Sequence, residues 1–535
     1  MRWHLLRLTA LTMALAAGAR ASAANNAATA TAAPDPYALA AKIDALLIEQ
    51  LKKAGVTPAP KADDAEYLRR AMLDLNGRIP LPREYYELTG AKEADKRRQL
   101  VDKLLANPGY VNHFTDVYRE LFLPEASTNI EVSYLRFGFD SWLQKKLRDN
   151  SPYDVMAREM ITSEIGNRRN QYFNPFGGQE NPLAFFAAKE AKPENIASAV
   201  TKAFLGVRIE CAQCHNHPFA RWSREQFWGT AAFFAGIERT QQNIYSPMRE
   251  IYDRREIAIP NSEPLKVVQA SFLDDKEPQW KFQTSSRVTF AEWMTAADNP
   301  YFARNAVNRL WAHFFGTGIV DPVDDFNDEN KPSHPELLDE LAKAFIAAKY
   351  DTKFMIRAIL ATEAYQRSSK VSDSSSNPRL YGHMSTKGMT GEQLFDSLAA
   401  AVGYRDPFPR NSPQFLFAGN NPRVEFVSKF NSTSKVTETQ TSILQALMLM
   451  NGKFLGDATN VEKSETLAAV ADAPFMDNAR RIETLYISAL GRKPHPEELQ
   501  KLVKYIETGD SAKQKQRLGD VYWTLLNSVE FRVNH

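Results

Sequence analysis

The chain has 535 residues, 44% of them hydrophobic, and a chain of this length can form two or more globular domains. Its 66 Lys and Arg residues nearly balance its 64 Asp and Glu residues, so the net charge of +2 lacks the basic excess typical of nucleic-acid-binding proteins. We therefore expect a globular protein whose partners do not include nucleic acid.

The first 23 residues have the pattern of a secretory signal peptide. Arg2 and Arg7 precede an apolar run at 8–17, and small residues at 21–23 form a cleavage pattern. A membrane anchor is the alternative, but the run is short for a span and no later segment is long enough. We expect cleavage, export to the periplasm or cell envelope, and no membrane span in the mature chain. Losing the leader's three arginines leaves 63 basic and 64 acidic residues.

The mature chain is predicted to be mainly α-helical, with two helical domains separated by a small β-containing insertion. Helical periodicity dominates both halves, and a Ser-x-x-Glu capping box at Ser333 is expected to start one of the helices. Short β-branched or alternating stretches mark the insertion. The predicted segments are a signal peptide at 1–23, a linker at 24–36, a helical domain at 37–245, the insertion at 246–290 and a second helical domain at 291–535.

Two segments near the chain ends share one pattern. "AMLDLNGRIPLPREYYEL" at 71–88 and "LYISALGRKPHPEELQKL" at 485–502 both read helix, Gly-Arg-x-Pro-x-Pro, helix, and each is followed by a charged joint and a third helix. Gly77 and Gly491 are placed to stop a helix, and the prolines restart the chain. The pattern predicts a pseudo-repeated three-helix unit whose two copies pack together.

The only two cysteines, Cys211 and Cys214, lie in one C-x-x-C-H motif that ends at His215 and is followed by His217. In an exported protein this spacing fits three kinds of site. The two thiols and His215 match covalent attachment of a c-type haem. The thiols with His215 or His217 match a Zn or Cu site. The third interpretation is a Cys211–Cys214 disulfide without a cofactor. Pro218 favours extended backbone at His217 and thereby favours a local metal site over a continuous haem-site helix.

A haem also needs an apolar pocket and, in most cases, a distal ligand. Aromatic residues near the motif either line such a pocket or belong to the ordinary core: Phe204, Phe219, Trp222, Phe227, Trp228, Phe233 and Phe234. No spacing identifies the distal ligand, for which the candidates are Met156, Met160, His113, His313 and His383.

A second group of polar residues lies on the helix expected from Pro300 to Phe315. It is either one wall of a polar pocket or a helix side that bonds a neighbouring loop, and it comprises Asn305, Asn308, Arg309 and His313. The acidic run from Asp321 to Glu329 supplies oxygen ligands of the kind Ca²⁺ uses, but it lacks the spacing of the helix-loop-helix calcium motif. We expect a solvated loop there.

Long motifs across nearly the whole mature chain resemble a known pair of domains. "LRRAMLDLNGRIP", "SPYDVMAREMIT" and "FLGVRIECAQCHNHPFARW" resemble the planctomycete-type cytochrome-c-like domain. "NPYFARNAVNRLWAHFFGTGIVDPVDDF" and "PSHPELLDELAKAF" resemble its planctomycete-specific C-terminal partner domain. Both domains are of unknown function. The resemblance implies a helical, cytochrome-like protein with Cys211, Cys214 and His215 as its haem-attachment residues.

The sequence therefore predicts an exported c-type-haem-like protein that transfers electrons to a redox partner or carries out a haem-dependent oxidation. The alternative is a non-haem protein that binds or hydrolyses envelope polysaccharide. In that case the Cys211–Cys214 segment holds a metal ion or a disulfide, and Arg309 and His313 lie in the cleft. The sequence leaves open whether the protein is an enzyme.

Overall fold

The computed structural model describes residues 34–166, 180–218, 220–241, 243–274, 276–370, 377–408, 410, 421–430, 448–450, 452–508 and 510–535. The predicted signal peptide and nearly all of the linker lie outside these residues, as does Phe219. Within the described part helices predominate and strands are short, which confirms the mainly α class. No helix in that part is both long and apolar enough to cross a membrane.

The first half of the chain is a succession of helices whose ends follow from local sequence. Asp63 caps α3 by accepting a hydrogen bond from the Glu66 amide, and the helix ends at Gly77 in the left-handed conformation. Asn107 caps α6 in the same way, with a proline in the helix's first turn. The elements are α2 (Pro36–Lys53), α3 (Asp64–Asn76), α4 (Pro82–Gly90), α5 (Lys96–Ala106), α6 (Pro108–Phe122), η1 (Pro124–Ser127), α7 (Ile130–Arg148), α8 (Tyr153–Thr162), α9 (Ala184–Ala188), α10 (Pro193–Val200), η2 (Thr201–Leu205), η3 (Glu210–Gln213) and α11 (Arg224–Ala232).

Two small antiparallel hairpins separate the helical regions, as predicted. In the first, β1 (Ile237–Arg239) pairs with β2 (Met248–Glu250); in the second, β3 (Glu256–Ala258) pairs with β4 (Val267–Gln269). The first hairpin begins before residue 246, the expected start of the insertion. Each hairpin is too short to be stable alone, so its position depends on contacts with the surrounding helices.

The second half returns to helices, and one predicted cap is wrong. Helix α14 begins at Pro335 with His334 as its N-cap, while the Ser333 hydroxyl donates instead to the Ile319 carbonyl at 3.2 Å. The elements are α12 (Ser286–Met294), α13 (Phe302–Phe315), α14 (Pro335–Ala347), α15 (Thr352–Ala361), α16 (Glu363–Gln366), η4 (Pro378–Leu380), β5 (Lys387–Gly388), α17 (Gly391–Val402), α19 (Pro422–Phe430), α21 (Lys453–Ala458), α22 (Glu465–Asp472), α23 (Asn478–Leu490), α24 (Pro496–Ile506), α25 (Ser511–Asn527), η5 (Glu530–Arg532) and β6 (Val533–Asn534).

The buried side chains form two hydrophobic clusters. The larger runs from Leu39 to Met384 and includes Ile487, so helices from both sides of the hairpins share one core. The smaller joins Leu73 and Ile79 to residues between 389 and 531. The division between the two hydrophobic clusters therefore lies near β5. The insertion predicted at 246–290, in contrast, contributes residues to the larger cluster.

The two Gly-Arg-x-Pro-x-Pro segments have the same local structure. Gly77 has φ 68° and ψ 16°, and Gly491 has φ 69° and ψ 17°. The arginine that follows each glycine forms a two-pronged ion pair with the glutamate at N3 of the next helix. These pairs are Arg78–Glu84 and Arg492–Glu498.

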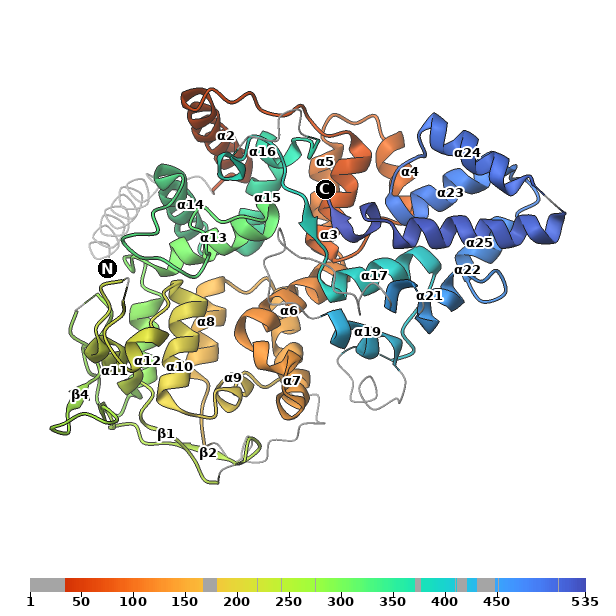
Figure 1. The fold of residues 1–535 in the computed structure, drawn as a ribbon. Helices are drawn as coiled ribbons and strands as arrows, with labels where there is room; N and C mark the ends of the chain where they lie inside the picture. Colours follow the sequence, from red (N-terminus) through yellow and green to blue (C-terminus); the bar gives the residue numbers. More distant parts are fainter. Residues whose placement is uncertain are drawn as a thin grey trace, which may run out of the picture. The chain divides into compact units, whose positions relative to one another are not determined.

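The two copies also contact each other, in line with the predicted pseudo-symmetric pair. Helices α4 and α23 are neighbours, and Gly491 lies against Pro80 (Figure 1). Arg69 on α3, with 1% of its surface exposed, donates to the carbonyls of Ala489 and Phe531 in the second copy. A buried guanidinium surrounded by carbonyl acceptors thus joins the two ends of the chain.

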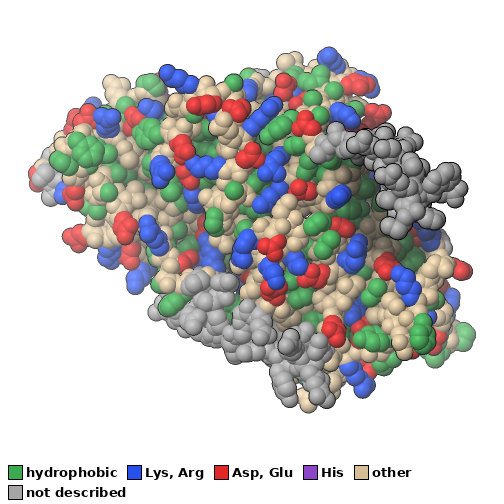
Figure 2. Space-filling view, turned by 180° about the vertical axis from the view of Figure 1, so that it is seen from behind, with side chains coloured by type: hydrophobic (Ala, Val, Ile, Leu, Met, Phe, Trp, Pro, Cys, Tyr) green, Lys and Arg blue, Asp and Glu red, His purple; other side chains and the backbone are tan. Residues whose placement is uncertain are grey.

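Acidic and basic side chains are interspersed on the face of the molecule seen in Figure 2. This distribution matches the near balance of charge in the sequence. Charge of one sign therefore does not dominate that face.

Candidate functional site

The C-x-x-C-H motif begins on the short 3-10 turn η3 at the protein surface, with Cys214 at the C-cap of the turn and His215 just beyond it. Cys211 and Cys214 are both exposed and both free thiols, while Ala212 between them is buried and anchors the turn. Both thiols are therefore accessible from solvent, on either side of the buried Ala212.

The backbone of this turn is held in place by the helix that follows. The Gln213 carbonyl accepts hydrogen bonds from Trp228 Nε1 at 3.0 Å and Arg224 Nε at 3.4 Å. The Arg224 amide also donates to Asn216 Oδ1 at 3.0 Å. These bonds fix the turn before any ligand arrives.

The two histidines have different roles in the local structure. His215 is exposed, and its Nδ1 lies 2.7 Å from the Asn216 carbonyl, so Nδ1 carries the proton and Nε2 keeps a lone pair for a ligand. His217 closes the following loop: its amide donates to the Trp222 carbonyl, and its Nδ1 accepts from the Ala220 amide at 2.9 Å. Among the described residues no three His, Cys, Asp or Glu side chains are grouped to hold a metal ion.

The aromatic residues around the motif belong to the core. The described ones are all buried, and Phe204 stacks on Phe122 with ring centroids 5.1 Å apart, as Phe233 does on Phe272 at 5.0 Å. A hollow of about 300 Å³ adjoins the loop at Trp222, but neither thiol nor His215 lines it. The donor set thus fits covalent attachment of a haem, whereas these aromatic residues do not enclose one.

The predicted polar residues on α13 make mostly structural bonds. Asn305 Nδ2 donates to the Ala203 carbonyl at 2.8 Å. Asn308 exchanges two bonds with the Val320 backbone, and both asparagines are fully buried. These bonds hold α13 against η2 and against the loop that follows α13. This agrees with the second interpretation of these residues, a helix side that forms hydrogen bonds to a neighbouring loop.

Arg309 and His313 extend beyond that structural contact and line a cavity of about 520 Å³. Arg309 donates to Asn305 Oδ1 and to the Lys202 carbonyl, and burial lowers its pKa. The lining of the cavity also includes Asp324, which is paired with Arg208. Asp324 belongs to the acidic run considered for Ca²⁺, so at least one of its carboxylates is occupied by an arginine.

A buried ionic cluster behind this cavity was not predicted from the sequence. His313 Nε2 lies 2.8 Å from the Asp74 carbonyl, and the Asp74 carboxylate accepts from Lys387, Tyr365 and Asn534. The sequence carried no clear signal for it, because Asp74 lies four residues after Arg70 and such i,i+4 charge pairs are common on solvated helix faces. The His113 ring lies beside the His313 ring, with centroids 5.6 Å apart and planes tilted by 44°, so two of the candidate distal ligands lie here.

We expect acid to destabilise the protein partly through His113. Burial, and then the neighbouring His313, lower the pKa of His113 to about 3. The unfolded residue titrates near 6.5, so below that pH the unfolded state takes up the proton and the folded state does not. Between pH 7 and pH 5 this residue alone should remove about 2 kcal/mol from the free energy of unfolding.

Urea unfolding at both pH values measures this loss. In His113→Gln the difference in unfolding free energy between pH 7 and pH 5 should shrink by about 2 kcal/mol, whatever the variant's stability at pH 7. An unchanged difference would show that His113 is already protonated when folded or does not titrate in this range.

Comparison with known proteins matches two family models to the chain. The model described as PSCyt2, protein of unknown function (DUF1549), matches residues 42–239, which include the C-x-x-C-H motif. The model described as PSD1, protein of unknown function (DUF1553), matches residues 286–417 and 422–506. Strands β2, β3 and β4 lie between the two matched segments, and β1 lies at the end of the first. No curated protein and no solved structure matches the chain.

Proposed function

The chain is a PSCyt2–PSD1 protein, which joins the planctomycete-type cytochrome-like domain to its partner domain, and from this premise we propose that it is an exported electron-transfer protein carrying a c-type haem at Cys211, Cys214 and His215. Export to the periplasm or cell envelope is part of the proposal and rests on the leader at residues 1–23. Its partner would be another redox protein in the same compartment.

The observation that carries the proposal is the arrangement of η3. Each thiol would add across one vinyl group, its sulfur bonding one carbon and its proton passing to the other, so no oxidant is consumed. Cys211 and Cys214 both expose their thiols at this surface turn, and His215 Nε2 would be the protein's ligand to the iron. When bound, the haem would supply one-electron redox chemistry at its iron.

The exposure of the motif favours electron transfer over haem-dependent oxidation. Oxidation needs a distal pocket that controls access to the iron, and the described aromatic residues near the motif are closed into the core instead. A haem attached on this outward face would have an edge open to a partner protein. Electron transfer requires only that a partner protein can approach this haem edge.

A soft metal ion is the second candidate occupant. Cys211, Cys214 and His215 offer sulfur and imidazole donors of the kind that bind Zn or Cu, and His217 is two residues away. The lack of an enclosing aromatic pocket favours this smaller occupant. Because His217 Nδ1 already accepts a backbone bond, His217 would have to coordinate through Nε2.

The test is export of the full chain in a host that matures c-type cytochromes. We expect haem absorbance to remain with the denatured protein and the mass to exceed the mature chain by one haem. The Cys211→Ser/Cys214→Ser double variant should lose both signals. His217→Gln is the matched control and should keep them, since glutamine can also accept the Ala220 bond.

A bare-chain mass without haem absorbance would overturn the proposal. Metal analysis and thiol titration of the same sample then separate the remaining alternatives. A metal ion lost in the double cysteine variant would establish the second candidate. Absence of free thiols without metal would establish the disulfide.

A further inference from the structure

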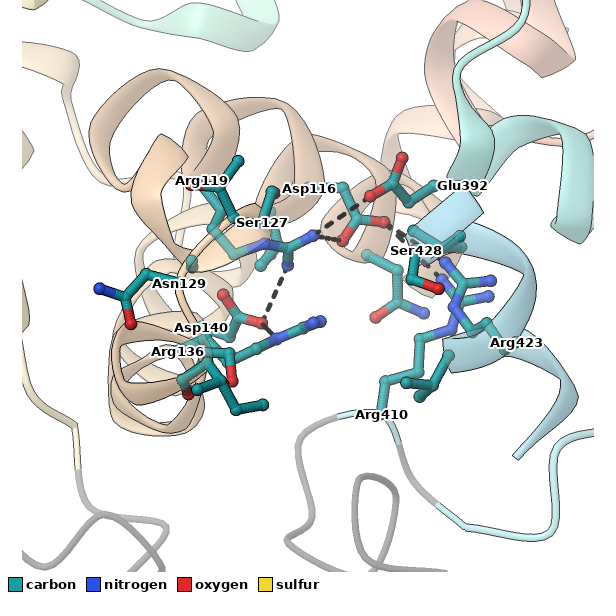
Figure 3. A pocket seen from close by; sticks show the side chains of 18 of the residues that line it. Asp116, Arg119, Ser127, Asn129, Arg136, Asp140, Glu392, Arg410, Arg423 and Ser428 are labelled. Atoms are coloured by element: carbon teal, nitrogen blue, oxygen red, sulfur yellow. Dashed lines mark hydrogen bonds and ion pairs between the residues drawn. The ribbon is translucent and has the colours of Figure 1, made fainter. Parts of the chain in front are cut away.

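Another cavity, lined by residues from 112–144 and 392–428 and not by the C-x-x-C-H motif, contains several arginine side chains. Its volume is about 320 Å³, within the range of small-molecule sites. Helices α6 and α7 form one side, and α17 and α19 contribute residues from the other (Figure 3). The charged residues that line it are Asp116, Arg119, Arg136, Asp140, Glu392, Arg410 and Arg423.

Arg119 is the fully paired member of the group. It lies 2.6 Å from Asp116, 2.9 Å from Asp140 and 3.8 Å from Glu392, and these carboxylates raise its pKa. Its side chain is 7% exposed. Its charge is therefore already neutralised by carboxylates of the protein.

The opposite side of the cavity carries two arginines that share one carboxylate. Arg410 and Arg423 both form ion pairs with Asp396, which lies behind them, and each lies nearly 4 Å from Asp116. In Figure 3 they approach the hollow from the side opposite Arg136.

Arg136 is the incompletely paired member. Its Nε lies 3.5 Å from Asp140, too far for a hydrogen bond, and this buried Nε has no hydrogen-bond partner in the described part of the chain. Figure 3 shows its guanidinium pointing into the hollow. Burial and the charge of Arg119 both lower its pKa, so an anion beside it would relieve an unfavourable charge.

Asp140 adds a second unsatisfied group to the same wall. Its side chain is 6% exposed, and Oδ1 is buried without a hydrogen-bond partner in the described structure. Buried polar atoms are nearly always paired, by protein, water or ligand. The wall formed by Arg136 and Asp140 therefore lacks both an acceptor for the guanidinium and a donor for the carboxylate.

The remaining lining and the charge balance define the class of ligand. The four arginines are balanced by four carboxylates, Asp396 included, so a polyanion such as nucleic acid or polyphosphate does not fit. Thr115 and Ser133 also line the cavity; their hydroxyls donate to backbone carbonyls, so each oxygen can still accept a hydrogen bond. Asn129 adds an amide at the same cavity.

We propose that this cavity binds an acidic sugar, with its single carboxylate or sulfate group on the Nη fork of Arg136 and its hydroxyls on the serine, threonine and asparagine side chains. An acidic sugar supplies both missing partners, since its anion accepts from the arginine and its hydroxyls donate to carboxylate or hydroxyl oxygen. The site is separate from the redox proposal and does not depend on haem attachment.

Calorimetric titration of the full exported chain tests the proposal with glucuronate, glucose and inorganic sulfate as probes. Glucuronate should bind most tightly, because only it offers anion and hydroxyls together. Arg136→Gln should weaken glucuronate at least about tenfold. Arg148→Gln removes the same charge from an exposed position on the same helix, outside the cavity, and should leave the affinity unchanged.

The proposal would be overturned by no glucuronate binding in the wild type, by equal affinity in Arg136→Gln, or by glucose binding as tightly as glucuronate. Sulfate binding as tightly as glucuronate would likewise reject the sugar. If Arg136→Gln unfolds, Arg136→Lys keeps the charge without the two-pronged geometry. Glucuronate affinity in this variant should then be lower than in the wild type, and equal affinity would again reject the fork.

Discussion

Replacing Asp74 by alanine should lower the free energy of unfolding by about 3–5 kcal/mol, the cost typical of breaking a buried ion pair from one side. Asp74 is 2% exposed, and its carboxylate accepts from Lys387 at 2.6 Å, Asn534 at 2.7 Å and Tyr365 at 2.8 Å. Without it the Lys387 ammonium remains buried, and its remaining partners in the described part of the chain are the His313 and Phe314 carbonyls. Burial already lowers the pKa of Lys387, so loss of the carboxylate should lower it further.

Urea unfolding of matched variants measures this effect. Asp457→Ala removes the carboxylate of an exposed lysine pair with Lys463 and should cost no more than about 1 kcal/mol. Adding Lys387→Met to Asp74→Ala should recover part of the loss, because the uncompensated charge is then gone. If Asp74→Ala were as stable as Asp457→Ala, the hydrogen bonds and ion pair of Asp74 would not contribute substantially to the stability of the fold.

The sequence was sufficient for features set by neighbouring residues. Gly77 and Gly491 end helices in the left-handed conformation, and the Gly-Arg-x-Pro-x-Pro joints share one geometry because the glycine, arginine, prolines and N3 glutamate all lie within eight residues. The second hairpin followed from the β-branched stretches at 256–260 and 265–273 in the same way, whereas the first hairpin carries no such stretch.

Features set by distant residues were not predictable. Arg69 meets carbonyls 420 or more residues away, and Asp74 meets Lys387 across 313 residues. The expected cap at Ser333 was wrong because the Ile319 carbonyl, 14 residues away, takes its hydroxyl. Local spacing carries no signal for such pairings.

The candidate site also combines features set by neighbouring residues with features set by distant ones. The spacing of Cys211, Cys214 and His215 indicated a common site, and the structure leaves both thiols exposed at one surface turn. The role of the surrounding aromatic residues depended on tertiary packing, which placed Phe204 and Phe233 in the core. Periodicity alone cannot separate a core aromatic from a pocket aromatic, since both are apolar.

Replacing Glu250 by alanine should also cost about 3–5 kcal/mol, because this residue joins the first hairpin to the helical core. Its carboxylate accepts from Arg287 through both oxygens and from the Ser285 hydroxyl. Arg287 also donates to the Ile161 carbonyl at 2.5 Å, and the ion-pair partners are 2% and 4% exposed. The variant leaves a buried guanidinium without its counter-charge.

Glu238→Ala is the matched control on the other strand of the same hairpin. Glu238 pairs with Arg249 and Arg254, whose side chains are largely exposed, so its loss should cost no more than about 1 kcal/mol. Urea unfolding compares the two variants, and hydrogen exchange locates the change. Amides of α12 and the hairpin should lose protection in Glu250→Ala and keep it in Glu238→Ala. Equal stability of the two variants would mean that the hairpin is held by its apolar contacts and not by the Glu250–Arg287 pair.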